Sequence, residues 1–221
     1  MRHVWTVLCL ALLVAGAGPA TAAVPTRLAE LVRPVPVTAG PQRLVQETSS
    51  QVLDILRKRH DQIAADPSCL YGLINRAVLP HFDFRRMAAW VLGRYWRRTT
   101  PQQKVRFVEA FRQLLVRTYG MALLEFYDLD IRFLPTRVSA DGRSAVVRTR
   151  VIRRDGPPVE VNYRMYRTPE GWKVYDVSVG GISLVSSYRA GFLREIRTHG
   201  IEALIHRIVQ QNAASKPKPK G

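Results

Sequence analysis

The sequence is poor in cysteine and in acidic side chains for its length of 221 residues. Its two cysteines, Cys9 and Cys69, are too few for a disulfide framework or a cysteine-rich zinc module. Its 17 Asp and Glu residues stand against 34 Lys and Arg residues, which gives a formal net charge of +17 at pH 7. This excess predicts an acidic partner, such as anionic lipid, an acidic protein surface or nucleic acid.

Motifs of the common enzyme classes are also missing. The sequence has no G-x-S-x-G nucleophile elbow, no P-loop, no H-E-x-x-H helix and no G-x-G-x-x-G fingerprint. His199 and His206 are seven residues apart, but Gly200 lies between them and no cysteine or carboxylate cluster joins them. A pair of surface histidines is the better interpretation, so we expect neither a metal site nor a cofactor.

Two single residues bear on whether the protein is an enzyme. Asp176 lies among apolar residues beside Tyr175 and can serve as a general base in such a setting. More commonly a carboxylate of this kind accepts a hydrogen bond at a strand end, and Ser183 is an available donor. Cys69 has no neighbouring His or Asn motif, which favours a buried, unreactive thiol. An enzyme that uses Asp176 or Tyr175 stays open as an alternative.

The N-terminus has the pattern of a secretory signal peptide. A short basic start is followed by an almost wholly apolar run at residues 4–17 and by an A-x-A cleavage site that ends at Ala22. The run is shorter than the about 20 residues that a membrane-spanning helix needs. No later segment is apolar for 18 residues, so we expect a soluble exported chain. Export argues against nucleic acid and favours anionic membranes or acidic proteins as partners.

Prolines and hydrophobic spacing divide the remaining chain. Residues 23–40 contain Pro25, Pro34 and Pro36 and are expected to form an extended leader with at most a short helix near 28–32. Apolar spacing and capping residues predict helices, and alternation between tight turns predicts strands. The expected helices cover residues 41–66, 67–78, 84–92, 101–126, 184–198 and 201–211, and the expected strands cover 131–134, 144–152, 159–167 and 172–179.

The order of these elements predicts the fold class. Three tight turns join the four expected strands, which is typical of an antiparallel meander. Helices, a meander and further helices make one α+β domain at residues 41–212, with helices layered on a curved sheet. The basic tail at 213–221 is expected to be disordered.

Large apolar side chains are more numerous than closing a core requires. The helix at 101–126 is so apolar, with Val105 widening its inner face, that we expect it to lie against a broad surface, such as a sheet. These side chains either fill a solid core, as in an interaction module, or wall a cavity for an apolar ligand. The candidate cavity residues are Phe107, Phe111, Leu115, Tyr119, Val147, Val151, Tyr163, Tyr175, Val177 and Phe192.

Basic residues gather in two segments. One group follows residue 84 and includes Arg97, and the other decorates the expected strands with Arg148, Arg150 and Arg164. In the strand at 144–152 the arginines alternate with apolar residues, so one face of the sheet should be wet and basic. These four arginines are the candidates for contact with a partner or a phosphate head group, because Arg binds phosphate in a bidentate manner. A solvated positive face is the alternative.

Several separated motifs resemble one known family in their order and spacing. They are residues 79–87 (LPHFDFRRM), 91–93 (VLG), 100–103 (TPQQ), 171–177 (GWKVYDV) and 181–185 (GISLV). Together they resemble the MlaC family of periplasmic phospholipid-binding proteins, also known as the toluene-tolerance family. The resemblance extends over residues 42–211, nearly the whole chain after the signal peptide.

The resemblance implies a fold and a role. It implies an NTF2-like curved antiparallel sheet with packed helices that enclose an apolar cavity for a phospholipid. It also implies a periplasmic carrier, not an enzyme, that shuttles lipid between an outer-membrane lipoprotein–porin complex and an inner-membrane ABC transporter with MCE domains. That role maintains the lipid asymmetry of the outer membrane. Some relatives handle hopanoids, which leaves the cargo open, and we expect a monomer that binds no nucleic acid.

Overall fold

The computed structural model describes residues 28–66, 68–120, 129–152 and 156–214. The signal peptide predicted at residues 1–22, the end of the helix predicted at 101–126 and most of the predicted tail lie outside the described residues. Part of the predicted leader is described, and it is not merely extended. Its short helix η1 (Leu28–Leu31) packs on the following helices, and Leu28 is 2% exposed.

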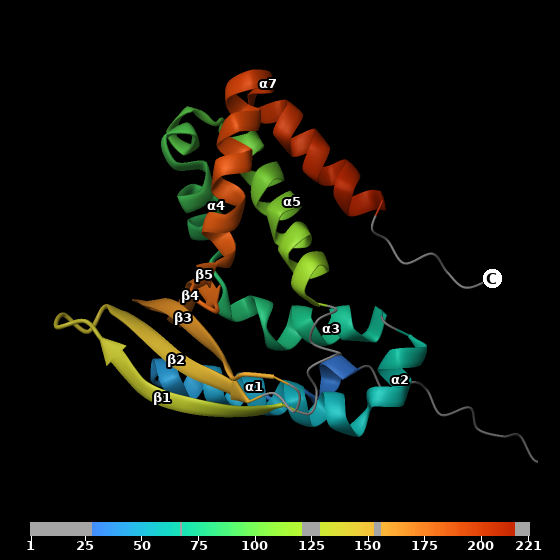
Figure 1. Ribbon diagram of the computed structural model, residues 1–221, viewed down its shortest axis with the longest axis vertical. Helices are drawn as coiled ribbons and strands as arrows, with labels where there is room; N and C mark the ends of the chain where they lie inside the picture. The colour runs from blue at the N-terminus through green and yellow to red at the C-terminus, as the bar shows by residue number, and fades with distance from the viewer. Residues whose placement is uncertain (1–27, 67, 121–128, 153–155, 215–221) are drawn as a thin grey trace, which may run out of the picture.

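The helices come mostly before the sheet in the sequence (Figure 1). After η1 the chain forms α1 (Pro41–Lys58), α2 (His60–Ala65), α3 (Ser68–Ala77), η2 (Leu79–His81), α4 (Phe84–Leu92), η3 (Gly93–Arg98) and α5 (Pro101–Gly120). The strands are β1 (Asp130–Val138), β2 (Ser144–Ile152), β3 (Val159–Thr168), β4 (Gly171–Val179) and β5 (Ile182–Ser183), and α7 (Leu184–Ala214) follows them.

The five strands form one antiparallel sheet in the order β1-β2-β3-β4-β5. This arrangement confirms the predicted meander and the α+β class, and it adds the short β5. In β2, Val147 and Thr149 are buried while Arg150 is exposed, as the alternation of apolar and basic residues predicts. The sheet thus presents a buried face to the core and a basic face to solvent.

Helix ends follow the capping residues that the sequence contains. Asp83 accepts a hydrogen bond from the Arg86 backbone N–H at 2.8 Å, and Thr100 and Gln103 form a reciprocal capping box at 3.2 and 3.0 Å. Gly200 has φ 84° and ψ 170°, so α7 bends there, in agreement with the two helices predicted at 184–198 and 201–211.

Two predictions about the helices are wrong. The single helix expected at 41–66 breaks at Arg59, and the bend brings Ile63 into the same buried cluster as Leu56. Val105 does not belong to the inner face of α5, and the broad surface that α5 lies against is made of helices and not of the sheet. Helix α5 packs on α4 and α7, which stand with it at one end of the sheet, while α1 lies along the sheet (Figure 1). Val105 is 69% exposed, because it faces away from these helices.

The helices α4, α5 and α7 pack together and form what we call the helical group. Asp83 connects this group to the sheet. Its backbone N–H donates to the carbonyl of Val174 in β4 at 2.8 Å, and its second carboxylate oxygen accepts a hydrogen bond from the Tyr166 hydroxyl in β3. The Arg86 guanidinium lies over the Tyr166 ring at 4.0 Å and near the Tyr175 ring at 4.7 Å. The start of α4 is therefore held to both β3 and β4.

Replacement of Gly93 by alanine should destabilise the protein by about 1–3 kcal/mol, because a residue with a Cβ is strained at this backbone conformation. Gly93 has φ 53° and ψ −123°, and its Cβ would lie 2.5 Å from the Arg189 guanidinium. Urea unfolding measures the loss. The control is Gly191→Ala on α7, where a Cβ meets nothing within 4 Å and the helix should gain stability. Equal effects of the two substitutions would contradict the strain at Gly93.

Candidate functional site

An apolar cavity of about 310 Å³ lies between the sheet and several helices. Helices α1 and α3, the loop around η2, the start of α4 and the last two turns of α5 surround it. The sheet closes the other side through β1, β3 and β4. The lining residues are Leu44, Val45, Thr48, Ser49, Val52, Leu53, Ile74, Val78, Leu79, His81, Phe82, Phe84, Met87, Leu115, Val116, Tyr119, Gly120, Ile131, Tyr163, Val174, Val177 and Leu184.

The cavity forms where three hydrophobic clusters meet. The helical cluster contributes Phe84 and Leu115, the cluster around α3 contributes Ile74, and the cluster between α1 and the sheet contributes Val45 and Val177. Each cluster is packed within itself, but the amphipathic helices that carry them converge on one space without filling it. Its volume is at the lower end of the range for ligand pockets, about 300–1000 Å³.

Among the described residues, the few polar groups in the lining offer no acid–base pair. Burial raises the pKa of Tyr163 to about 12, so its phenol stays protonated at neutral pH. Burial and the nearby Lys173 ammonium lower the pKa of His81, so the imidazole is neutral at pH 7. The Thr48 hydroxyl is buried and has no hydrogen-bond partner among the described residues. Such a lining suits an apolar ligand better than a reacting one.

Four of the ten residues predicted to bind lipid line this cavity: Leu115, Tyr119, Tyr163 and Val177. The geometry is compatible with the predicted contact for these four, which stays a prediction. Leu115 and Tyr119 lie one helical turn apart near the end of α5. Tyr163 and Val177 are directly paired on β3 and β4.

The other six candidates lie outside the lining. Phe107, Phe111 and Phe192 pack on one another in the helical cluster, with Phe192 edge-on to both other rings at 5.9 and 5.8 Å, so they fill a solid core. Val147 is fully buried between the sheet and α1. Tyr175 lies between the guanidinium groups of Arg86 and Arg164, and Val151 is a partly buried residue of β2 that does not reach the cavity.

Sequence reasoning missed the contribution of α1 and of the loop before α4. Apolar spacing predicted a helix from residue 41, and Val45 and Val52 on its buried face line the cavity, but the pattern does not show whether such a face meets packed atoms or a void. Phe82 lines the cavity because it bridges to Val174 of β4, a pairing between distant parts of the chain that no local pattern indicates.

Asp176 and Cys69 have structural surroundings. Asp176 is 4% exposed and accepts a hydrogen bond from the Ser183 hydroxyl at 2.8 Å, as the structural interpretation predicts. Neither Asp176 nor Tyr175 lines the cavity, so the geometry gives no support to the enzyme alternative. Burial and Asp66 raise the pKa of the Cys69 thiol, which lowers its reactivity.

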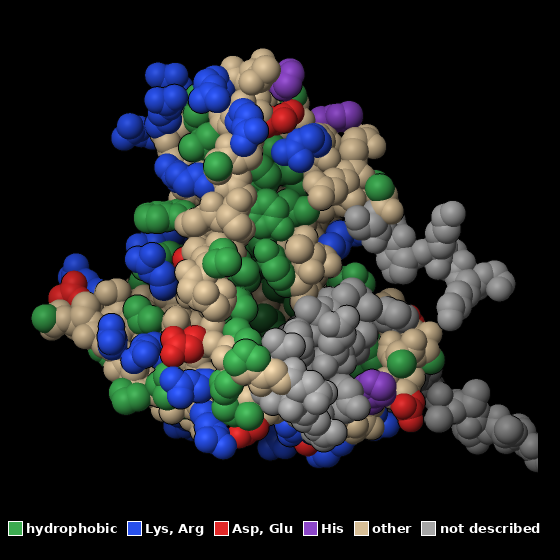
Figure 2. Space-filling model, viewed as in Figure 1, with side chains coloured by type: hydrophobic (Ala, Val, Ile, Leu, Met, Phe, Trp, Pro, Cys, Tyr) green, Lys and Arg blue, Asp and Glu red, His purple; other side chains and the backbone are tan. Residues whose placement is uncertain are grey.

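The four arginines predicted for head-group or partner contact lie on two different surfaces. Arg97 is exposed on η3, at the far end of the helical group. Arg148 and Arg150 lie on the solvent side of β2, where Arg150 pairs with Glu160 at 3.4 Å. Arg164 is exposed on β3, with its guanidinium 5.5 Å from the Tyr175 ring. Figure 2 shows basic side chains over both regions, separated by apolar and neutral surface.

Within the part of the chain that the structure describes, no helix is long and apolar enough to cross a membrane. The same residues contain no group of three or more His, Cys, Asp or Glu side chains arranged to hold a metal ion.

Comparison with known proteins gives consistent matches. The family model of the MlaC protein matches residues 46–210. The toluene tolerance protein ttg2D of Pseudomonas putida is 30% identical over 161 residues, which are 72% of this chain and 74% of that protein. The intermembrane phospholipid transport system binding protein MlaC of Haemophilus influenzae is 23% identical over 181 residues, 80% of this chain and 84% of that one.

A solved structure is also similar. It is a phospholipid-binding protein from Ralstonia solanacearum in complex with a phospholipid. The TM-score is 0.73 and the sequence identity is 30%, and the match covers 80% of this chain and 99% of the other.

Enlargement of the side chain to Phe should destabilise the protein at one valine of the sheet and have little effect at another. Val177 faces the cavity, whereas Val147, in the same cross-strand row, is fully buried in packed core. Val147→Phe should cost about 1–3 kcal/mol through overpacking, while Val177→Phe should change stability by less than about 1 kcal/mol because its ring enters the void. Urea unfolding of lipid-free protein compares them. A large loss for Val177→Phe would show that no void is available there.

The neutral state of His81 should make stability depend on pH. The folded pKa is lowered relative to the unfolded chain, so the unfolded state binds the proton first as pH falls below about 6.5. The contribution of neutral His81 to the free energy of unfolding is thus fully present above that pH, and it is lost as the pH falls toward the pKa of the folded state. His81→Gln should reduce the loss between pH 7.5 and 5.5 in urea unfolding, while the exposed His206→Gln control should leave it in place. Identical profiles for wild type and His81→Gln would contradict this assignment.

Proposed function

Because the chain belongs to the MlaC family, we propose that it carries phospholipid, with acyl chains in the apolar cavity and the head group at the opening. The observation that carries the proposal is the cavity of about 310 Å³, whose lining is almost entirely apolar. The phospholipid bound to the similar protein of R. solanacearum supports this choice of cargo.

The energy of acyl chains in water explains why such a carrier needs a cavity. Two chains bring roughly thirty methylene groups at about 0.8 kcal/mol each, so their exposure costs on the order of 24 kcal/mol. An exposed groove cannot shield that much surface. A membrane stabilises the chains about as well as the cavity does, so transfer between them is nearly neutral. Direction then has to come from partner complexes or from ATP that they hydrolyse.

The proposed setting is the periplasm, on the basis of the signal-peptide pattern. There the protein, as a monomer without nucleic acid, exchanges lipid with an inner-membrane ABC transporter bearing MCE domains and with an outer-membrane lipoprotein–porin complex. This exchange maintains the lipid asymmetry of the outer membrane. The name of the H. influenzae relative, a binding protein of an intermembrane phospholipid transport system, supports this setting.

Docking on those complexes requires exposed groups outside the cavity. Arg97 and Arg164 are exposed, and among the described residues neither forms an ion pair with a carboxylate. Their charges are therefore available to a partner. Arg148 and Arg150 add charge on the solvent face of the sheet. We assign these four arginines to partner or head-group contact, as predicted from the sequence.

The protein purified from cells should contain phospholipid, which mass spectrometry of a solvent extract detects. Leu115→Glu should lower the molar ratio of lipid to protein at least fivefold, because it puts a carboxylate into the cavity wall. Val105→Glu on the same helix is the control, since Val105 is 69% exposed and the added charge stays in water.

Circular dichroism establishes that both variants are folded. If Leu115→Glu does not fold, Val177→Phe provides a second reduction of the cavity volume without a buried charge. Wild-type protein that is consistently free of lipid, or equal loading of the two Glu variants, would refute the carrier function.

A further inference from the structure

A second pocket, of about 290 Å³, lies between η3 and the first half of α7. It is lined by Arg94, Tyr95, Arg189, Leu193 and Arg197, none of which lines the apolar cavity. On α7 the residues Arg189, Leu193 and Arg197 are spaced by four, so they form one stripe along the helix. Arg94 and Tyr95 face this stripe from η3.

The three arginines of this pocket have no acidic partner. Among the described residues, no carboxylate forms an ion pair or hydrogen bond with Arg94, Arg189 or Arg197. The two acidic residues of α7 are engaged elsewhere. Glu195 faces His199 and Arg207 at 3.6 Å each, and Glu202 accepts hydrogen bonds from Gln103 and Arg106.

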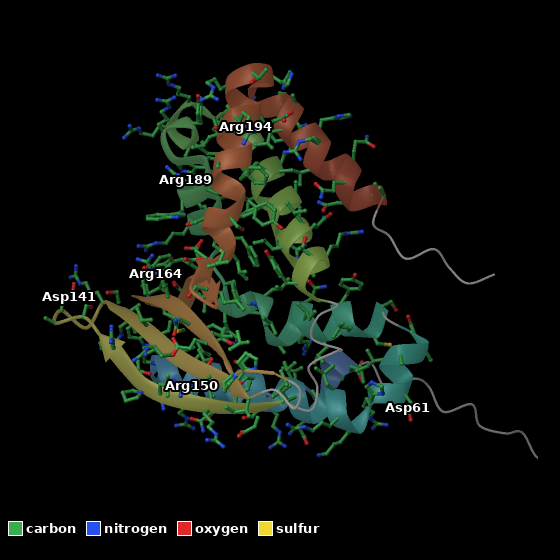
Figure 3. The ribbon with its side chains drawn as sticks, in the orientation of Figure 1. Asp61, Asp141, Arg150, Arg164, Arg189 and Arg194 are labelled. Carbon is green, nitrogen blue, oxygen red and sulfur yellow. The ribbon has the colours of Figure 1, made fainter. Side chains whose placement is uncertain are left out.

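One of these arginines is fixed by the backbone. The Arg189 guanidinium donates a hydrogen bond to the carbonyl oxygen of Trp90 and lies against Gly93, where a Cβ would be only 2.5 Å away. The absence of a side chain at Gly93 is what lets the guanidinium lie there. Arg189 is half-buried and held from one side, so its other N–H groups remain available to an anion in the pocket. Figure 3 shows Arg189 on α7, on the side of the helix nearest α4.

We propose that this arginine pocket is a docking site for a carboxylate-bearing segment of a partner protein. Three unpaired guanidinium groups match an acidic side chain in charge and in hydrogen-bond geometry. Leu193 and the Tyr95 ring give the pocket an apolar side that suits the methylene groups of Glu. Trp90 beside it is 49% exposed, and Trp, Tyr and Arg are the residue types that dominate protein interfaces.

The shape of the site favours a protein segment over a membrane surface. The arginines line a recess, which a protruding side chain of a partner can enter. A bilayer presents a broad surface, and arginines exposed on a convex face of the protein would bind it equally well. A recess is therefore not needed for binding to a membrane. The inference goes beyond the proposed function, because it assigns a partner site that is separate from the lipid cavity and does not depend on which lipid is carried.

The test uses the purified protein and the peptide acetyl-Glu-Glu-Leu-Glu-Glu-amide in 150 mM salt, which screens long-range attraction. Side-chain Nε–Hε resonances of arginine, followed by NMR, should shift saturably for Arg94, Arg189 and Arg197. The Gln analogue of the peptide should produce no shift. The double variant Arg94→Glu/Arg197→Glu should bind the acidic peptide at least tenfold more weakly.

The matched control is Arg143→Glu/Arg167→Glu, which changes the net charge equally at exposed positions, one in the turn before β2 and one on β3. It should bind the peptide within twofold of wild type. Equal weakening of both double variants would overturn the proposal, because it would show attraction by overall charge alone. Displacement of the peptide by an equal concentration of inorganic phosphate would overturn it in favour of a phosphate site.

Two further measurements separate the remaining outcomes. The first is cosedimentation with vesicles of 70% phosphatidylcholine and 30% phosphatidylglycerol. If the protein cosediments only when Arg94 and Arg197 are present, and the peptide does not bind, the proposal is overturned in favour of a membrane site. Lipid loading of the Arg94→Glu/Arg197→Glu variant should equal that of wild type. Empty wild-type protein would refute the carrier function and leave the peptide result standing, so the two failures are distinguishable.

Discussion

The arrangement of the cavity depends on the attachment of Asp83 to the sheet. This residue caps α4, accepts the hydroxyl of Tyr166 and pairs its backbone N–H with Val174 of β4. Phe82 and Phe84 on either side of it line the cavity, as does Val174. The helical group and the sheet are thus joined where the start of α4 meets β3 and β4. The apolar cavity lies next to this junction.

The hollow arises because apolar surface is distributed over three clusters. The aromatic rings of Phe107, Phe111 and Phe192 pack against one another. Val147 and Met165 are likewise buried in the packed cluster between the sheet and α1. The residues left over at the junction are mostly aliphatic side chains on separate, rigid elements. Since no single element can move to fill the space without breaking its own cluster, the protein retains a cavity that a hydrocarbon chain can occupy.

The two arginine-rich surfaces lie outside the lining of this cavity. The described residues of the cavity lining include no Lys or Arg, whereas arginines occupy the solvent face of β2 and β3 and the recess between η3 and α7. Figure 3 shows Arg150 and Arg164 on the sheet and Arg189 and Arg194 on α7. The proposed storage of lipid and the proposed recognition of an acidic partner can therefore be altered independently.

Local sequence was sufficient for most of the helices and strands and for the class of fold, because capping residues such as Asp83 and Thr100, the glycine at 200 and the alternation in β2 act within a few positions. It also marked which faces are apolar. It did not predict the break at Arg59 or the short β5. It could not distinguish a packed face from a hollow one: Phe111 and Leu115 lie one turn apart on α5, yet the first meets aromatic rings and the second meets the void. That difference depends on which distant segments arrive opposite each residue, and only the tertiary structure decides it. The same holds for Gly93 and Arg189, which are far apart in sequence and meet at a single contact.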